Sequence, residues 1–217
     1  MTKIEYIDFI RNSLPMVDKT NKFHPEQVAA AINVAVNTVF YEMYEQQPKS
    51  FKKAMERYST IVQVAVDSTT APHRKYTSTL TVDVVDLPSK SGGIFGIQLR
   101  NPGGFSITTT TEFVPVGILE GEQFYGAEST LPSNVVGFSW DRQRSIEYWI
   151  GAPISATWAD DDLYVRVIKQ FRSYASTDNV LLPYGQDTRI IELVREYLGV
   201  IPPKDLVNNN ADIRTNG

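Results

Sequence analysis

The chain contains no cysteine and two histidines, His24 and His73, and these scarcities exclude several kinds of site. Without cysteine there is no disulfide framework, no thiolate metal site and no cysteine nucleophile. Two histidines by themselves do not complete the usual zinc ligand set. We therefore predict no bound metal and no cofactor, and the lack of cysteine slightly favours assembly in a reducing compartment.

Long apolar runs and a strong charge of one sign are also missing. No stretch approaches the roughly 18 apolar residues that a membrane span needs, and Lys3 and Glu5 place charges inside any signal-like start. Lys and Arg number 21 against 25 Asp and Glu, a formal net charge of -4. This balance argues against broad, sequence-independent binding of nucleic acid. We predict a soluble protein with no membrane contact and no cleaved signal.

The N-terminal region has the periodicity of two helices. Thr2 and Glu5 fit a capping box, and the helix that follows is predicted to end or kink near Pro15. A second helix begins at Pro25, which suits the first helical position. Its apolar stripe is wide, so we predict that this face is largely buried or faces a partner. The stripe consists of Val28, Ile32, Ala35, Val36, Val39 and Met43.

From Ile61 the period changes to two, and β-branched residues predict strands. The expected strands cover residues 79–84, 94–99, 105–119, 134–140, 145–150 and 163–171. A glycine turn is predicted at 91–93. A last helix carries apolar residues at helical spacing and stops at Gly199. The residues that carry this spacing are Ile190, Ile191, Val194, Tyr197 and Leu198.

These patterns predict an α+β fold in three parts. Residues 1–58 form an N-terminal helical region. Residues 59–204 form a central antiparallel β-sandwich or partly open barrel, with the C-terminal helix packed on the sheet. Residues 205–217 lack apolar periodicity and form a flexible C-terminal arm.

Acidic side chains offer two weak candidates for chemistry. The run Asp160–Asp162 has oxygen ligands for a hard cation, but it lacks the spacing of a calcium loop, and a solvated turn is the simpler interpretation. Glu112, Asp141 and Glu147 offer carboxylates for a glycosidase pair, which only a separation in space identifies. We predict no catalytic residue.

Histidine and tryptophan have similarly plain interpretations. His24 directly precedes a helical proline, which favours a capping role or exposure over a role as a base. His73 lies beside two basic residues and fits a solvated loop. Trp140, Trp149 and Trp158 are consistent with a sugar-stacking platform, but we favour core anchors of a sheet.

A basic group provides the candidate interface. Lys49, Lys52, Lys53 and Arg57 fall on adjoining faces of a short helix expected between Phe51 and Tyr58. Such a face is suited to nucleic acid or to an acidic partner. An ordinary solvated face is the alternative.

Two regions of the chain resemble small virion proteins of tailed phages that infect gut bacteria, including the crAss-like group. The resemblance is carried at one end by Tyr6–Arg11 and Lys22–Val28, and at the other by Asp162–Val167, Tyr174–Val180 and Pro183–Leu198. It implies a non-catalytic structural protein of the neck or tail, a ring or adaptor subunit between the portal and the tail. It further implies a homo-oligomeric ring that contacts the portal and other neck or tail proteins, in a virion assembled in the host cytoplasm. Contact with DNA passing through the lumen stays open.

Two other functions remain open from the sequence. One is a host-surface module of the virion that binds glycan through the β-rich middle and its tryptophans. The other is a glycan hydrolase of the same virion. Assembly on a portal separates the structural role from both of them.

Overall fold

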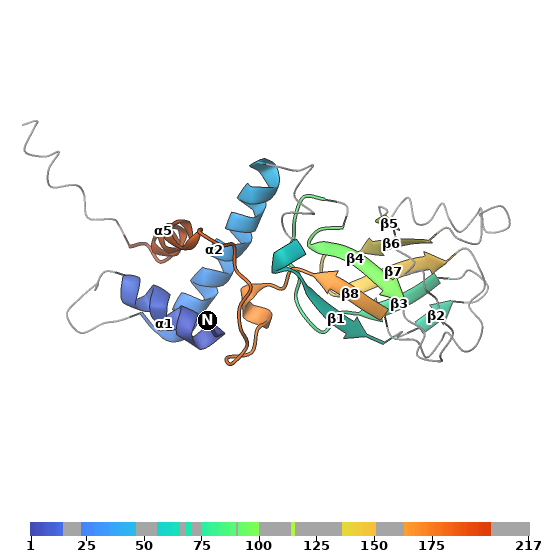
Figure 1. Cartoon of the computed structure of the whole chain (residues 1–217), viewed down its shortest axis with the longest axis horizontal. Helices are drawn as coiled ribbons and strands as arrows, with labels where there is room; N and C mark the ends of the chain where they lie inside the picture. The colour runs from blue at the N-terminus through green and yellow to red at the C-terminus, as the bar shows by residue number, and fades with distance from the viewer. Residues whose placement is uncertain are drawn as a thin grey trace, which may run out of the picture.

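The structure, a computed structural model, describes residues 1–14, 23–46, 56–65, 68–70, 75–89, 91–99, 114–115, 136–150 and 163–200. The helices are α1 (Lys3–Ser13), α2 (Pro25–Gln46) and α5 (Asp187–Tyr197), with 3₁₀ turns η1 (Glu56–Tyr58) and η3 (Phe171–Ser173). The strands are β1 (Thr60–Val64), β2 (Ser68–Thr70), β3 (Lys75–Thr79), β4 (Ile94–Leu99), β5 (Val114–Pro115), β6 (Val136–Trp140), β7 (Ser145–Ile150) and β8 (Leu163–Val167). The helices gather at one end and the strands at the other (Figure 1). The predicted α+β fold is confirmed.

Helix α1 begins and ends where the sequence predicts. The Thr2 side chain accepts a hydrogen bond from the Glu5 N–H at 3.4 Å, and the Glu5 carboxylate accepts one from the Thr2 N–H at 2.8 Å. Both halves of the capping box are therefore formed. The helix ends at Ser13, two residues before Pro15.

Helix α2 is the centre of the helical part. Five of its six predicted stripe residues are buried, and Met43 is partly buried against the same core. The helix contacts α1, η3 and α5. This explains its wide stripe, because three neighbours on different sides cover more of its surface than one neighbour would.

Helix α5 ends in a Schellman motif. Gly199 has φ +67°, its N–H donates to the Glu196 carbonyl at 3.0 Å, and the Val200 N–H donates to the Arg195 carbonyl at 2.8 Å. The predicted stop is confirmed. The packing partner of the helix differs from our prediction: α5 packs on α2, and its buried Ile190 and Val194 belong to the helical core rather than to the sheet core.

The strands form two sheets with a shared core. Within the described residues, the orders are β1-β8-β4 and β2-β3-β7-β6-β5, and all pairs except β5–β6 are antiparallel. Buried side chains of both sheets meet in one cluster, which makes the architecture a sandwich. The cluster includes Val64, Ile94, Ile97, Val165 and Val167 of the first sheet and Phe138, Trp140 and Ile146 of the second.

A strand over residues 79–84 was predicted, and this prediction is wrong beyond its first residue. Strand β3 ends at Thr79, and Val84 makes only an isolated bridge with Lys169. Burial follows the predicted pattern only in part: Leu80 and Val84 are buried and Thr81 is exposed, but Val82 and Asp83 are both partly buried. This partial pattern comes from packing along an irregular segment rather than from a strand.

Two short segments connect the helical core to the sheet core. Val84 and Val167 lie in the sheet core, whereas their successors Val85 and Ile168 lie in the helical core. The Val85 N–H donates to the Ile168 carbonyl at 3.0 Å. Since successive residues of extended chain point to opposite sides, these paired segments contribute side chains to both cores.

The turn at 91–93 also fixes a large core residue. Gly92 has φ +54°, and a Cβ added to it would lie 2.1 Å from Cζ3 of Trp140. Only glycine fits this position, because the indole ring lies directly against its backbone. The predicted glycine turn is confirmed.

Candidate functional site

The basic group singled out in the sequence lies mostly outside the described residues. This applies to Lys49, Lys52 and Lys53. Arg57 is in η1, and its guanidinium carbon lies 5.4 Å from the centre of the Tyr58 ring. The contact is a cation–π interaction within the subunit. The interface formed by the four residues stays a prediction.

Of the carboxylate candidates, Asp141 and Glu147 lie in the described part, Glu147 in β7. Asp160–Asp162 and Glu112 lie outside it. Asp141 has a local role, since its Oδ1 accepts hydrogen bonds from the N–H groups of Gln143 at 2.8 Å and Ser145 at 3.0 Å. These contacts hold the turn between β6 and β7. Among the described residues, no group of three or more acidic or histidine side chains is placed to hold a metal ion.

Trp140 is a core residue, as favoured from the sequence, with 4% of its surface exposed. Trp158, His73 and the side chain of Trp149 lie outside the described residues. His24 is exposed, and its backbone N–H donates to the Gln27 side chain at 3.1 Å. It therefore occupies the capping position before α2.

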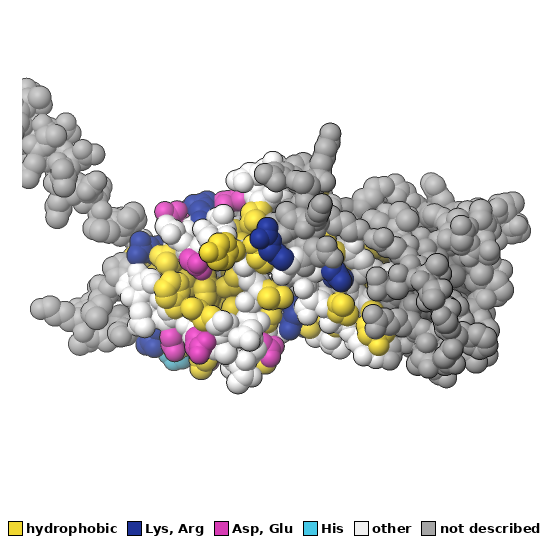
Figure 2. All heavy atoms as spheres, viewed as in Figure 1, with side chains coloured by type: hydrophobic (Ala, Val, Ile, Leu, Met, Phe, Trp, Pro, Cys, Tyr) yellow, Lys and Arg dark blue, Asp and Glu magenta, His cyan; other side chains and the backbone are white. Residues whose placement is uncertain are grey.

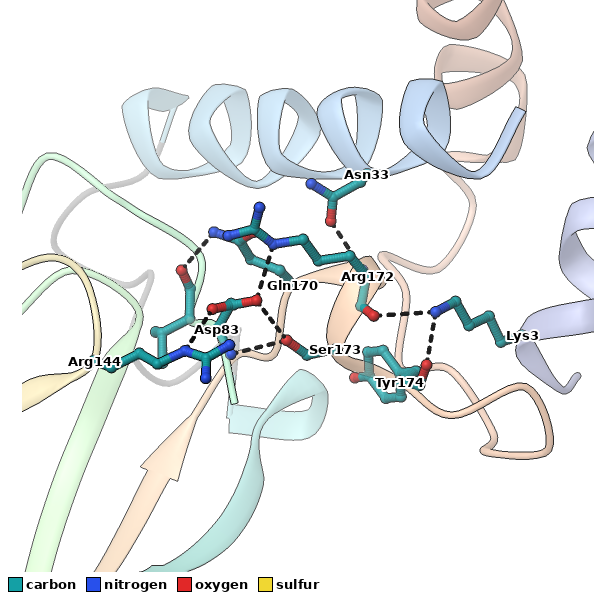
Figure 3. A network of polar contacts seen from close by, with 9 residues as sticks. Lys3, Asn33, Asp83, Arg144, Gln170, Arg172, Ser173 and Tyr174 are labelled. Carbon is teal, nitrogen blue, oxygen red and sulfur yellow. Dashed lines mark hydrogen bonds and ion pairs between the residues drawn. The ribbon is translucent and has the colours of Figure 1, made fainter. Parts of the chain in front are cut away.

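A cluster of charged side chains lies where the helical and sheet parts meet (Figure 3). Its centre is the carboxylate of Asp83, which is 19% exposed. Nε of Arg144 donates to Oδ1 at 3.0 Å, and Nε of Arg172 lies 2.9 Å from Oδ2. The Ser173 hydroxyl donates to Oδ2 at 3.2 Å and accepts from the Asp83 N–H at 2.8 Å. Asp83 thus holds two guanidinium groups, one on each oxygen.

The electrostatics of the cluster stabilise the ionised carboxylate. Burial by itself raises the pKa of Asp83. The hydrogen bond from Arg144, the positive charges of Arg172 and Arg144 and the hydrogen bond from Ser173 outweigh burial, so this pKa lies below its ordinary value of 3.8. Asp83 is therefore ionised at neutral pH.

The helical part fixes one of the two arginines through its backbone. The Arg172 N–H donates to Oδ1 of Asn33 on α2 at 2.9 Å. Nζ of Lys3 donates to the carbonyls of Arg172 at 3.1 Å and Tyr174 at 2.7 Å, and partial burial lowers the Lys3 pKa. The hydrogen bonds made by Asn33 and by Lys3 are drawn in Figure 3. Turn η3 is thereby held between α1 and α2.

An open cleft of about 480 Å³ lies against the cluster. Its lining includes Asp83, Arg144 and Arg172, together with the 141–145 turn and Gln170. Arg142 also lines it, but its guanidinium is bound to the Asp86 carboxylate and to the Leu87 and Ser89 carbonyls. Two guanidinium groups are thus presented to the cleft from segments far apart in the sequence.

Sequence reasoning missed this site. From the sequence we placed Asp83 within a predicted strand and singled out neither Arg144 nor Arg172. The one local signal is the polar run Asp141–Arg144 between two strands, which indicates a turn and no particular partner.

No family model matches the chain, and no curated protein matches its sequence. Within the described residues, no helix combines the length and apolar character that crossing a membrane requires.

Replacing Asp83 with Asn is expected to lower the free energy of unfolding by about 2 kcal/mol at pH 7, because two guanidinium groups lose their shared carboxylate. The pKa of Asp83 is lower in the folded protein than its ordinary value of 3.8, so its contribution to stability is fully present above pH 3.8. This contribution is lost as the pH falls through the pKa that Asp83 has in the folded protein. Urea unfolding of wild type and Asp83→Asn from pH 7 to pH 2 measures the difference in their free energies of unfolding.

Asp86→Asn is the matched control, since Asp86 pairs with a single arginine and is 53% exposed. We expect a loss of no more than about 1 kcal/mol. A gap between wild type and Asp83→Asn that stays constant down to pH 2 would contradict the assigned role of the ion pairs.

Proposed function

We propose that this protein is a non-catalytic virion structural protein, a ring or adaptor subunit that connects the portal of a tailed phage to its tail. The two regions of resemblance support the proposal. The observation that carries it is a set of exposed apolar side chains on the three helices that the structure describes.

These side chains are exposed although the helical part has a core of fully buried side chains. Ile10, Ile32 and Phe171 are fully buried in that core. The exposed apolar residues are Ile4, Phe9, Val34, Tyr41 and Tyr197, each between 40% and 58% exposed. In Figure 2, hydrophobic side chains gather over the helical part on the side facing the viewer. A subunit that covers these side chains with its neighbours gains the free energy of burying them.

The two regions of resemblance are neighbours in space. The Lys3 N–H donates to the Asp178 carbonyl at 2.9 Å, the Ile4 N–H donates to the Ser176 carbonyl at 3.2 Å, and the Val180 N–H donates to the Met1 carbonyl at 3.2 Å. Thr2 and Asn179 form an antiparallel bridge. The Tyr6 hydroxyl also donates to Oδ1 of Asp187 at 3.1 Å, which joins a resembling segment of each region directly. Within the described residues, resembling segments of both regions therefore share the helical part, whereas Leu163–Val167 forms β8 of the sheet part. The shared helical part supports carrying over a role in assembly.

The proposal includes partners and a location. The subunit forms a homo-oligomeric ring, contacts the portal and other neck or tail proteins, and resides in a virion assembled in the host cytoplasm. Contact between the ring and DNA passing through its lumen stays open. The candidate residues for it are Lys49, Lys52, Lys53 and Arg57, of which three lie outside the described residues.

Electron microscopy and sedimentation of the purified protein, alone and with the portal protein of the same phage, test the proposal. We expect rings of one copy number, alone or on the portal. Ile4→Ser and Val34→Ser should weaken assembly at least about tenfold while leaving the melting temperature of the subunit nearly unchanged.

Asn12→Ser, at an exposed polar position of α1, is the matched control and should assemble normally. A protein that stays monomeric at high concentration and also fails to bind the portal would overturn the proposal. Turnover of a glycan that is lost on a single carboxylate substitution, with the fold intact, would overturn it as well.

A further inference from the structure

The two guanidinium groups at the Asp83 cluster have unused binding capacity. Arg144 and Arg172 both contact Asp83 through Nε. Within the described part of the chain, their terminal Nη groups have no hydrogen-bond partner. Their side chains are 55% and 61% exposed, and both line the same cleft.

The positions of these groups are fixed before any ligand arrives. Asp83 lies between the two guanidinium groups in Figure 3 and orients each of them. The Arg172 backbone is bound to Asn33 and Lys3, and Arg144 lies at the end of a turn held by Asp141. A fixed guanidinium loses less conformational entropy on binding an oxyanion than a free side chain does.

We propose that this cleft binds a carboxylate side chain, Asp or Glu, from a segment of a partner protein. Guanidinium Nη groups donate to carboxylate oxygens in a planar, charge-assisted geometry. Polar groups of Gln143 and Gln170 beside the arginines suit the peptide backbone around that carboxylate. This inference goes beyond the proposed function, because the cleft lies within one subunit and does not depend on the proposed ring.

The charge of the cleft favours a single carboxylate over nucleic acid. Its lining contains three arginines, at 142, 144 and 172, and two aspartates, at 83 and 141. Arg142 is paired with Asp86, so Arg144 and Arg172 are the guanidinium groups that can bind a ligand. A single carboxylate matches these two groups. A phosphate backbone brings a row of negative charges toward Asp141 and toward a chain with a formal net charge of -4.

The test uses the full chain and nuclear magnetic resonance of the arginine Nε–Hε groups. The probe is a capped Gly-Glu-Gly peptide, with capped Gly-Gln-Gly, inorganic phosphate and a short single-stranded DNA as comparisons. We expect the glutamate peptide to shift the Arg144 and Arg172 signals saturably, and the glutamine peptide to leave them in place. Arg144→Lys and Arg172→Lys should each weaken binding by about tenfold. Lysine keeps the positive charge but lacks the planar set of N–H donors with which a guanidinium group binds a carboxylate.

Arg189→Lys is the matched control. Arg189 also forms a partly exposed ion pair, with Glu42, but lies outside the cleft, so this variant should bind the peptide as wild type does. Melting temperatures identify any variant that fails to fold, and the comparison of the two peptides on the wild-type protein needs no variant. The proposal is overturned if the glutamine peptide gives the same shifts, or if phosphate or DNA saturates the signals at lower concentration than the glutamate peptide.

Discussion

Replacing Ile32 with Asp is expected to prevent the subunit from folding. Ile32 lies in the middle of α2, is fully buried, and belongs to the helical core. A carboxylate there has apolar neighbours and no cationic partner in the core cluster, so it costs about 4 kcal/mol or more. Folded domains are typically stable by about 5 to 15 kcal/mol, so such a loss removes most of the stability of a domain at the lower end of that range. Circular dichroism and urea unfolding measure the effect.

Val34→Asp is the matched control on the same helix. Val34 is two residues away and 42% exposed, so the new charge stays in water. We expect a change in the free energy of unfolding within about 0.5 kcal/mol. A folded Ile32→Asp protein with wild-type stability would show that the buried face of α2 is assigned wrongly.

Truncating Phe171 to Ala should lower the free energy of unfolding by about 3–5 kcal/mol. Phe171 is fully buried in η3, between α1 and α2. Its ring centre lies 6.0 Å from that of Tyr6, and Nζ of Lys3 lies 5.7 Å from it. The variant loses apolar burial, an aromatic contact and a cation–π contact together.

Tyr184→Ala is the control for Phe171→Ala. Tyr184 is an aromatic residue of the same C-terminal segment, but it is 89% exposed, and only its backbone N–H bonds to Tyr58. We expect a change below about 1 kcal/mol in urea unfolding. Equal losses in the two variants would contradict the placement of Phe171 at the centre of the helical core.

The helices could be predicted because their signals are local. The capping box at Thr2 and Glu5 lies within a single helical turn, and the Gly199 stop depends only on the backbone around it. The buried stripe of α2 follows from helical period alone. Strands β4 and β7 were also placed at their observed bounds, since each is a short apolar or alternating run between turn residues.

The failed predictions concern contacts between distant segments. The alternation at Leu80, Val82 and Val84 has the period of a strand, but this segment bonds mainly to residues 168–170 and packs beside two cores. The partner of α5 was wrong because apolar periodicity shows which face is buried and not what covers it. Asp83, Arg144 and Arg172 are separated by 61 and 28 positions, so no spacing rule connects them.

The pairing of residues 1–4 with 176–180 has a consequence for how the chain folds during synthesis. The N-terminal helices leave the ribosome first, yet the core around α2 needs Phe171, Ile190 and Val194. The chain between the N-terminal helices and these residues must close into a long loop, which lowers its conformational entropy before the contacts form. The apolar faces of the nascent helices that Phe171, Ile190 and Val194 cover in the folded protein therefore stay exposed until more than 190 residues have emerged from the ribosome. During that interval they are natural substrates for chaperones.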